Sequence, residues 1–448
     1  MKKKGKNRGH WLYFFTTIAY ILMFVWVFMF PGTKGLVIWD PGYAMYFYIL
    51  GFVGFVPMIL WLLDRFVIKK KRMYAIVFKL LSFILLLVPI AVVAFFLFSV
   101  SFKDVDLPPL IFINDSSEEN RYTFAYWTEE EQQDTIEVKT DRDDTVETVQ
   151  LTDNQETKRH YFTFGQTGVA SYEIHTPSET YTLEVPALTP TVKRFAIASD
   201  LHIGTTKSSL ENTQKMLKTI SSTPYNCLFL LGDLVEYGFA FEQWVEVWEV
   251  LAGKNSTIPI KPLIGNHDIL FGGHKLFEEL MGKDYFRVDF ENIHFITMKL
   301  PWGIEEFSNK QKQWLEQELN AIPKDDWIIV LTHAFLYASG YNYRGVLWRD
   351  NINAINELVP IFEENGVDMV FSGHNHQMEH LSNSGIEYFI TGVFGSHLDE
   401  DREFSSQGSQ WYSNKSHGYV DLAVGETSAT VTFFNDDAEE LYAHVVEK

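Results

Sequence analysis

The chain has 448 residues, with 37 lysines and arginines against 58 aspartates and glutamates, and a net charge of −21. That length suits two or three domains. The charge argues against a nucleic-acid partner, because a long polyanion would be repelled unless a local basic groove existed. It is also uneven: residues 1–100 hold 12 basic and two acidic residues, a net of +10, whereas residues 101–448 carry −31. The two parts are therefore chemically different.

Three long apolar segments predict a membrane region in residues 1–100. Residues 11–30 contain no charge, and twenty residues at ~1.5 Å each cross a hydrocarbon layer of ~30 Å. A cleaved signal peptide is the alternative for this segment, but the apolar run exceeds ~15 residues and no small-residue cleavage site follows. We therefore predict three transmembrane helices at about residues 11–30, 43–63 and 75–100, the last interrupted only by Lys79 near one end.

The basic residues of the short loops predict the orientation. Five precede the first segment and five lie between the second and third, whereas the loop between the first and second has only Lys34. By the positive-inside rule the two basic segments are cytoplasmic, so everything after residue 100 is outside. Cys227 is the only cysteine, which excludes an intrachain disulfide. We expect a multi-pass protein of a bacterial cell membrane with its larger part extracytoplasmic.

Residues 108–188 contain short runs rich in threonine, valine and aromatic residues. RYTFAYWT, DTIEVKT and HYFTFG are examples, and turn-forming residues separate them. Runs of this length and spacing predict an all-β, antiparallel, fibronectin-III-like sandwich. No cluster of catalytic residue types occurs here, so we expect a spacer or docking module.

Residues 193–448 change to continuous apolar runs separated by helical patterns. KRFAIAS, NCLFLLG, DWIIVLT and VDMVFSG are typical of strands that are covered on both faces. The segments between them, such as NKQKQWLEQELNAI, are typical of amphipathic helices. The pattern predicts an α/β domain with layered sheets flanked by helices, in which ligands bind at the carboxyl ends of strands.

Five of these predicted strands end in aspartate, asparagine or histidine. Alternate residues of an extended segment point the same way, so two side chains of one motif can reach one ion. Nitrogen and oxygen ligands together suit Mn, Fe or Zn, and this set is too large for one tetrahedral zinc. It suits two divalent metal ions ~3.5 to 4 Å apart. The candidate ligands are Asp200, His202, Asp233, Asn266, His333, His374 and His376.

The ordered motifs DLH, GD, GNHD, H and GHNH resemble those of the calcineurin-like metallophosphoesterases over about residues 193–435. The preceding sandwich, and TGVFGS after the last motif, are similar to the layout of purple acid phosphatases. The resemblance implies a bridging role for Asp233 and a general-acid role for His267, oriented by Asp268. It also implies one metal held by Asp200, His202 and His376, and a second held by Asn266, His333 and His374.

The resemblance to the purple enzymes has two departures. Those enzymes have a tyrosine three residues after the bridging aspartate, where this chain has Glu236 followed by Tyr237. Their first motif also lacks a histidine at the position of His202. We therefore expect a colourless, redox-inactive site.

Several other polar residues lie outside the ligand motifs. The loop of residues 339–350, SGYNYRGVLWRD, could line a substrate cleft or cover the core, and it holds two candidate phosphate-binding residues, Arg344 and Arg349. We expect His380 at the surface or behind the ligands. Five further histidines match no ligand position: His274, His294, His397, His417 and His444.

The expected function is hydrolysis of a phosphate monoester or diester by an extracytoplasmic, membrane-anchored domain. Three alternatives remain. The domain could face the cytoplasm and hydrolyse a cyclic nucleotide, it could be a nuclease, or it could be a catalytically inactive envelope-binding module. The identity of the substrate and the oligomeric state stay open.

Overall fold

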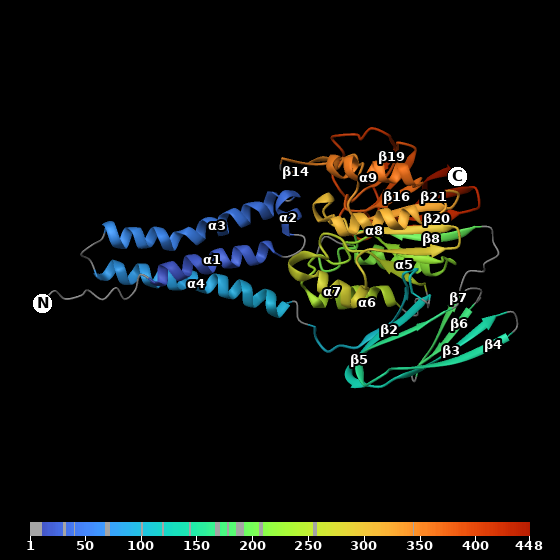
Figure 1. Cartoon of the computed structure of the whole chain (residues 1–448), viewed down its shortest axis with the longest axis horizontal. Coiled ribbons are helices and arrows are strands. Elements are labelled where there is room, and N and C mark those ends of the chain that lie inside the picture. The colour runs from blue at the N-terminus through green and yellow to red at the C-terminus, as the bar shows by residue number, and fades with distance from the viewer. Residues whose placement is uncertain are drawn as a thin grey trace.

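A computed structural model shows a helical bundle followed by a larger β-rich part (Figure 1). It describes residues 11–29, 33–39, 41–67, 72–99, 102–118, 121–142, 145–165, 171–176, 179–184, 192–205, 209–253, 258–343 and 345–448.

The bundle consists of three long helices that pack side by side. They are α1 (Trp11–Phe28), α3 (Pro41–Leu62), which ends in a π-helical turn (Leu63–Val67), and α4 (Arg72–Ser99). Each contains a segment long and apolar enough to cross a membrane, namely Trp11–Phe28, Ala44–Phe66 and Met73–Phe95. The prediction of three apolar helices is confirmed, and most of their large apolar side chains face outward.

A short helix, α2 (Thr33–Trp39), lies between α1 and α3, in a segment that we expected to be a loop. Seven residues are too few for a helix to be stable in isolation. Contacts with the rest of the protein therefore stabilise α2, and such contacts leave no periodic signal in so short a segment.

The larger part contains a nine-stranded sheet with parallel strands at its centre. Strands β8, β9, β10 and β1 are parallel neighbours, and the remaining pairs are antiparallel. In order across the sheet the strands are β22 (Glu440–Glu447), β21 (Ser428–Asn435), β20 (Gly418–Val424), β8 (Lys193–Ala198), β9 (Cys227–Leu230), β10 (Ile260–Pro262), β1 (Leu107–Ile113), β2 (Tyr122–Gln132) and β5 (Thr157–Phe164).

A seven-stranded sheet packs face to face on the nine-stranded one. Its strands are, in order, β11 (Phe286–Phe290), β12 (Ile293–Met298), β13 (Trp327–Thr332), β16 (Met369–Ser372), β18 (Ile386–Thr391), β17 (Met378–Asn383) and β19 (Ser409–Ser413). The ring of Phe295 on β12 lies 4.7 Å from that of Phe195 and 4.5 Å from that of Phe229, both on the other sheet. Aromatic side chains from both sheets therefore meet in the shared core, together with aliphatic ones such as Ile197 and Ile329.

Helices cover the outer faces of both sheets. The first sheet is covered by α5 (Leu210–Ser221), α6 (Phe241–Ala252) and α7 (His274–Met281), and the second by α8 (Asn309–Asn320) and α9 (Ile352–Asn365). A hairpin of β14 (Tyr341–Tyr343) and β15 (Val346–Trp348) forms a small separate sheet. The layered α/β prediction is confirmed.

The predicted sandwich is present as two packed sheets, but it is joined to the α/β part. A four-stranded sheet, with the order β4 (Thr145–Thr152), β3 (Thr135–Arg142), β6 (Ser171–His175) and β7 (Thr180–Glu184), packs on β1, β2 and β5. The rings of Tyr122 and Tyr172 lie 5.8 Å apart across this interface. Strand β1 also pairs with β10, through Phe112 and Ile260.

This pairing crosses the boundary that we placed between residues 108–188 and 193–448. An unpaired edge strand exposes backbone donors and acceptors, so pairing β1 with β10 satisfies them. The apolar pattern of a strand indicates which face is buried but not which strand lies beside it. The fibronectin-III-like character of the sandwich remains a prediction.

Candidate metal centre

The predicted ligands meet where β8, β9, β13 and β16 end. The segments that follow these strands are tied together by their backbones: the amide of His202 donates to the carbonyl of Asp233, and that of Gly373 donates to the carbonyl of His333. The amide of His374 donates to the Asp200 carboxylate at 2.9 Å. Motifs that lie far apart in the sequence thus form one cluster.

Four of the candidate ligands have a left-handed backbone. The φ angles are 63° for Asp200, 49° for His202, 50° for Asp233 and 71° for His374. Such a conformation costs roughly 1 to 3 kcal/mol for a residue other than glycine, and it is concentrated at functional sites. The chain accepts this strain where it directs the candidate ligands toward one another.

Two glycines allow the motifs to approach closely. A Cβ atom on Gly373 would lie 2.4 Å from the carboxylate of Asp200, and one on Gly265 would lie 2.2 Å from that of Asp233. Both contacts are sterically impossible for a larger residue in this backbone. The glycines of the GHNH and GNHD motifs are therefore required by packing beside the carboxylates.

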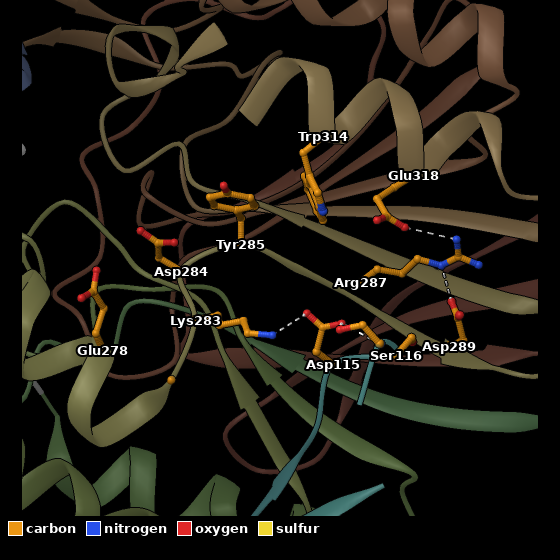
Figure 2. A pocket seen from close by; sticks show the side chains of 12 residues that line it. Asp115, Ser116, Glu278, Lys283, Asp284, Tyr285, Arg287, Asp289, Trp314 and Glu318 are labelled. Carbon is orange, nitrogen blue, oxygen red and sulfur yellow. Dashed lines mark hydrogen bonds and ion pairs between the residues drawn. The ribbon is translucent and has the colours of Figure 1, made fainter. Parts of the chain in front are cut away.

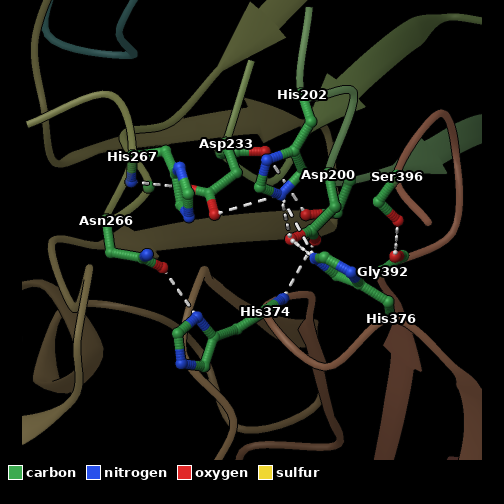
Figure 3. Close-up of polar contacts among 12 residues, drawn as sticks. Asp200, His202, Asp233, Asn266, His267, His374, His376, Gly392 and Ser396 are labelled. Atoms are coloured by element: carbon green, nitrogen blue, oxygen red, sulfur yellow. Dashed lines mark hydrogen bonds and ion pairs between the residues drawn. The ribbon is translucent and has the colours of Figure 1, made fainter. Parts of the chain in front are cut away.

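One group of ligands surrounds the carboxylate of Asp200 (Figure 3). Its Oδ1 lies 3.6 Å from Nε2 of His202 and 3.4 Å from Nε2 of His376, and these two nitrogens are 3.2 Å apart. Oδ1 is buried and has no hydrogen-bond partner among the described residues. Two imidazole nitrogens that face an unpartnered buried carboxylate oxygen fit a cation.

The second group surrounds the amide oxygen of Asn266. This Oδ1 lies 2.8 Å from Nε2 of His333 and 2.6 Å from Nδ1 of His374, and these two nitrogens are 3.2 Å apart. Oδ2 of Asp233 lies 3.4 Å from Nε2 of His333 and 3.5 Å from Nε2 of His202. Asp233 therefore lies between the two groups.

The electrostatics of the cluster also fit metal binding. Burial would raise the pKa of Asp233, but the charges of His333 and His267 hold it below its usual range. Burial and the neighbouring His333 lower the pKa of His374 to about 3, which keeps that imidazole neutral. A ligand histidine must be neutral and a ligand aspartate must be ionised, so Asp233 and His374 are in the state that a metal ion requires. Burial would lower the pKa of His333, but the charge of Asp233 raises it to about 9, so this ring must release a proton when a metal ion binds.

Two ring orientations are set by partners behind the ligands. Nδ1 of His202 lies 2.9 Å from the carboxylate of Glu236, and Nδ1 of His333 lies 2.8 Å from the carbonyl of Leu231. Such partners fix the tautomer that leaves Nε2 for the metal. We did not predict this role for Glu236, although its position three residues after Asp233 placed it near the cluster.

The predicted role of Asp268 is wrong. Its carboxylate accepts hydrogen bonds from the backbone amides of Leu234, Val235 and Gly265. The ring of His267 instead has Nδ1 2.8 Å from the carbonyl oxygen of Glu236. Asp268 therefore holds the loop after Asp233 in place and does not orient His267, because its side chain points toward buried amides that need an acceptor.

Four further residues differ from the expectations or lie beyond them. His380 is fully buried, with Nε2 2.8 Å from Glu387, so its expected place at the surface or behind the ligands is wrong. Arg344 lies outside the described residues. The guanidinium of Arg349 lies 4.0 Å from the ring centre of Phe404. His397, which we did not match to a ligand, has its ring 4.7 Å from that of His376.

A cavity of 870 Å³ lies away from this cluster, between the segment after β1 and the elements β11, α7 and α8 (Figure 2). Its cations are already engaged: Lys283 lies 3.4 Å from Asp115, and Arg287 lies 2.7 Å from Asp289 and 3.4 Å from Glu318. The predicted ligands do not line it. The cavity is therefore not the hollow in which the clustered ligands act.

Comparison with known proteins agrees with this geometry. The family model of calcineurin-like phosphoesterases matches residues 193–378. These residues form a domain of that family. The prediction from the five motifs is confirmed, and the family implies a dinuclear metal centre.

Relatives of the domain include plant enzymes. Purple acid phosphatase 18 of Arabidopsis thaliana is 24% identical over 275 residues, which cover 55% of this chain and 60% of that protein. The chain thus spans 60% of the length of this relative.

Two solved structures have a similar fold. Purple acid phosphatase PPD1 from yellow lupin (Lupinus luteus) seeds has a TM-score of 0.63 at 14% identity, covering 77% of this chain and 74% of that one. PhoD has a TM-score of 0.56 at 12% identity, covering 76% and 88%. Both structural matches cover more of the chain than residues 193–378, which the family model matches, so the similarity extends beyond that segment.

Proposed function

We propose that this chain is a membrane-anchored phosphoesterase that hydrolyses a phosphate monoester or diester with two divalent metal ions. The observation that carries the proposal is the position of Asp233 between two groups of nitrogen and oxygen ligands. Mn, Fe and Zn are the metals that suit these donors. Asp200, His202 and His376 would hold one ion, Asn266, His333 and His374 the other, and Asp233 both.

The metal ions, when bound, supply Lewis-acid chemistry that activates water and offsets the negative charge of the phosphate. The protein supplies the leaving-group proton. Because the carbonyl of Glu236 accepts a hydrogen bond from Nδ1 of His267, a neutral ring has its free lone pair on Nε2. When that nitrogen is protonated it can donate to the departing alkoxide. The side chain of His267 is 25% exposed, which leaves it accessible to a substrate.

The site is proposed to be redox-inactive. The position of the tyrosine of purple enzymes is taken by Glu236, whose carboxylate contacts the ring of His202. No phenolate is therefore supplied from that position. A metal-loaded sample without an absorption band in the visible range would agree with this proposal, and a purple sample would contradict it.

The phosphoesterase domain is proposed to face outside the cytoplasm. The start of α1 and the end of α3 lie at the end of the bundle that is remote from the phosphoesterase domain (Figure 1). The sequence segments next to these two points carry the basic residues. By the positive-inside rule, the remote end is cytoplasmic.

Protease added to spheroplasts tests this orientation. It should release an acidic fragment by cutting within about residues 101–107, between α4 and β1. Protection until lysis would reverse the orientation and favour the cytoplasmic cyclic-nucleotide alternative.

Metal analysis and assays of the purified full chain test the proposed activity. After removal of metal and reloading with manganese or zinc, we expect two ions per chain. We also expect hydrolysis of at least one ester in a panel of phosphomonoesters and diesters, and its loss with a chelator. Zero or one ion at saturation would contradict the dinuclear site, and two ions without any hydrolysis would favour the inactive binding module.

A further inference from the structure

The short helix α2 connects the membrane region to the phosphoesterase domain. It follows the first candidate span, which ends at Phe28, and precedes the second, which begins at Ala44. Four residues separate α2 from each span, so it lies at the membrane surface. Yet Thr33 and Leu36 are only 1% exposed. One face of α2 is therefore buried against protein.

That face of α2 packs on the wall of the metal centre. A Cβ atom on Gly35 would lie 2.3 Å from Cγ of Trp302, and Leu36 packs in one cluster with Leu270 and Trp302. The ring of Trp302 lies edge-on to that of His374, with centroids 5.8 Å apart. A single side chain thus separates the interfacial helix from a candidate ligand of the second metal.

A second membrane helix also reaches the phosphoesterase domain, at the loop that follows Asp233. The third candidate span ends at Phe95, and its ring lies 5.7 Å from that of Phe239, in the loop that follows Asp233. Phe239 also lies 6.0 Å from Phe271, which packs against the side chains of α1 and α3. Phe271 also packs against the cluster of Leu36, so this contact is continuous with that of α2, and it also places the metal centre next to the membrane surface.

The accessible side of the site borders these contacts. The side chain of His267 is 25% exposed and that of Glu236 is 20% exposed. The ligand side chains of Asp200, His202, Asp233, His333 and His376 are at most 10% exposed. Tyr237, beside Glu236, is 37% exposed, and its ring lies 5.8 Å from that of Phe239. The entrance to the site therefore lies along an aromatic loop that touches the end of a membrane span.

Other apolar side chains and an unpaired donor lie on this side of the domain. Leu347 of the β14–β15 hairpin is 46% exposed and precedes Trp348, which packs against the cluster of Leu36. Ile352, at the start of α9, is 59% exposed. The indole N–H of Trp302 is buried without a hydrogen-bond partner among the described residues. Exposed apolar side chains suit a bilayer surface, and a buried donor without a partner suits a ligand acceptor.

From these contacts we infer that the substrate is a phosphate ester of a membrane lipid, whose headgroup enters the metal centre from the plane of the membrane. The inference rests on the proposed phosphoesterase activity. Water forms a new bond to phosphorus, the bond between phosphorus and the lipid oxygen breaks, and that oxygen takes a proton. The resulting alcohol stays in the bilayer and the phosphate product leaves to the solvent.

The charge of the chain favours a substrate delivered by the membrane. Residues 101–448 carry a net charge of −31, which repels small soluble anions during diffusional encounter. A lipid in the same bilayer needs no such encounter, because the anchor and the substrate share one surface. The interfacial layer on each side of the hydrocarbon core is only about 5 to 8 Å thick, so a headgroup lies at the level of α2.

Matched substrates test the inference with the full chain reconstituted in phosphatidylcholine vesicles. The lipid substrates are dioleoyl phosphatidic acid and phosphatidylglycerol, and the soluble counterparts are glycerol 3-phosphate and glycerophosphoglycerol. We expect a kcat/KM higher by roughly 10²-fold or more for one lipid than for its counterpart, the gain that confinement to one surface gives. Equal values, or a preference for the soluble esters, would overturn the lipid inference and leave the proposed function standing. No hydrolysis of any ester, with p-nitrophenyl phosphate included, would reject both.

A docking variant separates membrane delivery from the chemistry. Leu36→Asp places a carboxylate in the buried contact of α2, and Ile38→Asp places one at a 47% exposed position of the same helix. Leu36→Asp should lower lipid hydrolysis roughly tenfold or more, because an unpaired buried charge is not tolerated there. Hydrolysis of p-nitrophenyl phosphate should fall much less than lipid hydrolysis, and Ile38→Asp should change neither rate. An equal fall in both rates for Leu36→Asp would show that α2 supports only the fold.

A measurement without turnover locates the entrance. The native Cys227 is fully buried, so an introduced cysteine can be labelled selectively with bimane. The label on Tyr237→Cys should be quenched by lipids brominated near the headgroup. The label on Val149→Cys, at a 50% exposed position of the strand β4 far from the bundle, should not be quenched (Figure 1). Equal fluorescence with and without brominated lipid at position 237 would contradict an entrance at the membrane.

Discussion

The helical bundle and the metal centre bury polar side chains in different ways. In the bundle, Thr16 is fully buried, and its hydroxyl donates to the carbonyl of Leu12 at 2.8 Å and to that of Ser82 at 3.1 Å. In the metal centre, Oδ1 of Asp200 is buried and has no partner among the described residues. The bundle satisfies the hydroxyl of Thr16 internally, although the hydroxyls of Thr17, Tyr20 and Ser82 have no partner among the described residues. The metal centre differs because its carboxylate and imidazole atoms face one another in a cluster that can hold a cation.

The difference shows what each region is built to do. An unsatisfied backbone group in hydrocarbon costs several kcal/mol, so a membrane helix pairs its own backbone amides and carbonyls. A site that binds cations must instead tolerate donor atoms that repel one another when the cations are absent. Mutations should therefore have large effects on metal binding in the centre and small effects on stability in the bundle.

The largest effect is expected from Asp233→Ala. It removes the carboxylate that lies between the two ligand groups, so both metal ions should be lost and activity should fall to the background rate. Elemental analysis of the purified chain measures the loss. Asp421→Ala is the control, because this buried carboxylate contacts Arg194 on the neighbouring strand β8 and lies outside the ligand groups. If Asp233→Ala retained two ions, the bridging role would be wrong.

The next largest effect is expected from His267→Ala. Both metals should stay bound, while the rate falls by roughly 10²- to 10⁴-fold, as for a positioned general acid. The loss should be large for an alkyl ester and small for p-nitrophenyl phosphate, whose leaving group needs little protonation. Loss of metal, or equal slowing of the two esters, would assign His267 to binding or positioning.

A smaller effect on the metal centre is expected from Glu236→Gln. The variant keeps the size of the side chain but weakens the contact with Nδ1 of His202. The affinity for one of the two ions should fall by roughly 10- to 100-fold, as is typical of partners behind metal ligands. Isothermal titration calorimetry with manganese should show two binding steps, one with a lower affinity than in the native protein and one with an unchanged affinity. Equal weakening of both steps would mean that Glu236 acts on the whole site.

The smallest effect is expected in the bundle, from Thr16→Val. Loss of the contact between α1 and α4 should lower the free energy of unfolding in detergent by about 0.6 kcal/mol, the average for such bonds in membranes. Thr17→Val is a matched control, since the hydroxyl of Thr17 has no hydrogen-bond partner among the described residues. Thermal unfolding measures both. Metal content should be unchanged, and a change in it would couple the bundle to the centre.

Much of the candidate site was predictable because each ligand motif follows a strand within a few residues. Asp200 and Asp233 come at the ends of continuous apolar runs, and parallel neighbouring strands bring such ends to one edge. The role of Asp268 was not predictable in the same way. Its position beside His267 suggested a contact between the two side chains. The Asp268 carboxylate instead accepts hydrogen bonds from buried backbone amides of the loop after Asp233.

The sequence by itself determined the three apolar helices and the alternation of strands and helices, and it predicted the residues that cluster at the candidate metal centre. These features depend on local patterns: a run of apolar residues, a period, or a motif at the end of a strand. Only the tertiary structure decided that β1 pairs with β10, that His380 is buried, and that α2 packs on Trp302. In each of these cases the partner comes from a distant part of the chain. A local pattern shows that a surface must be covered, but the packing of the whole chain selects what covers it.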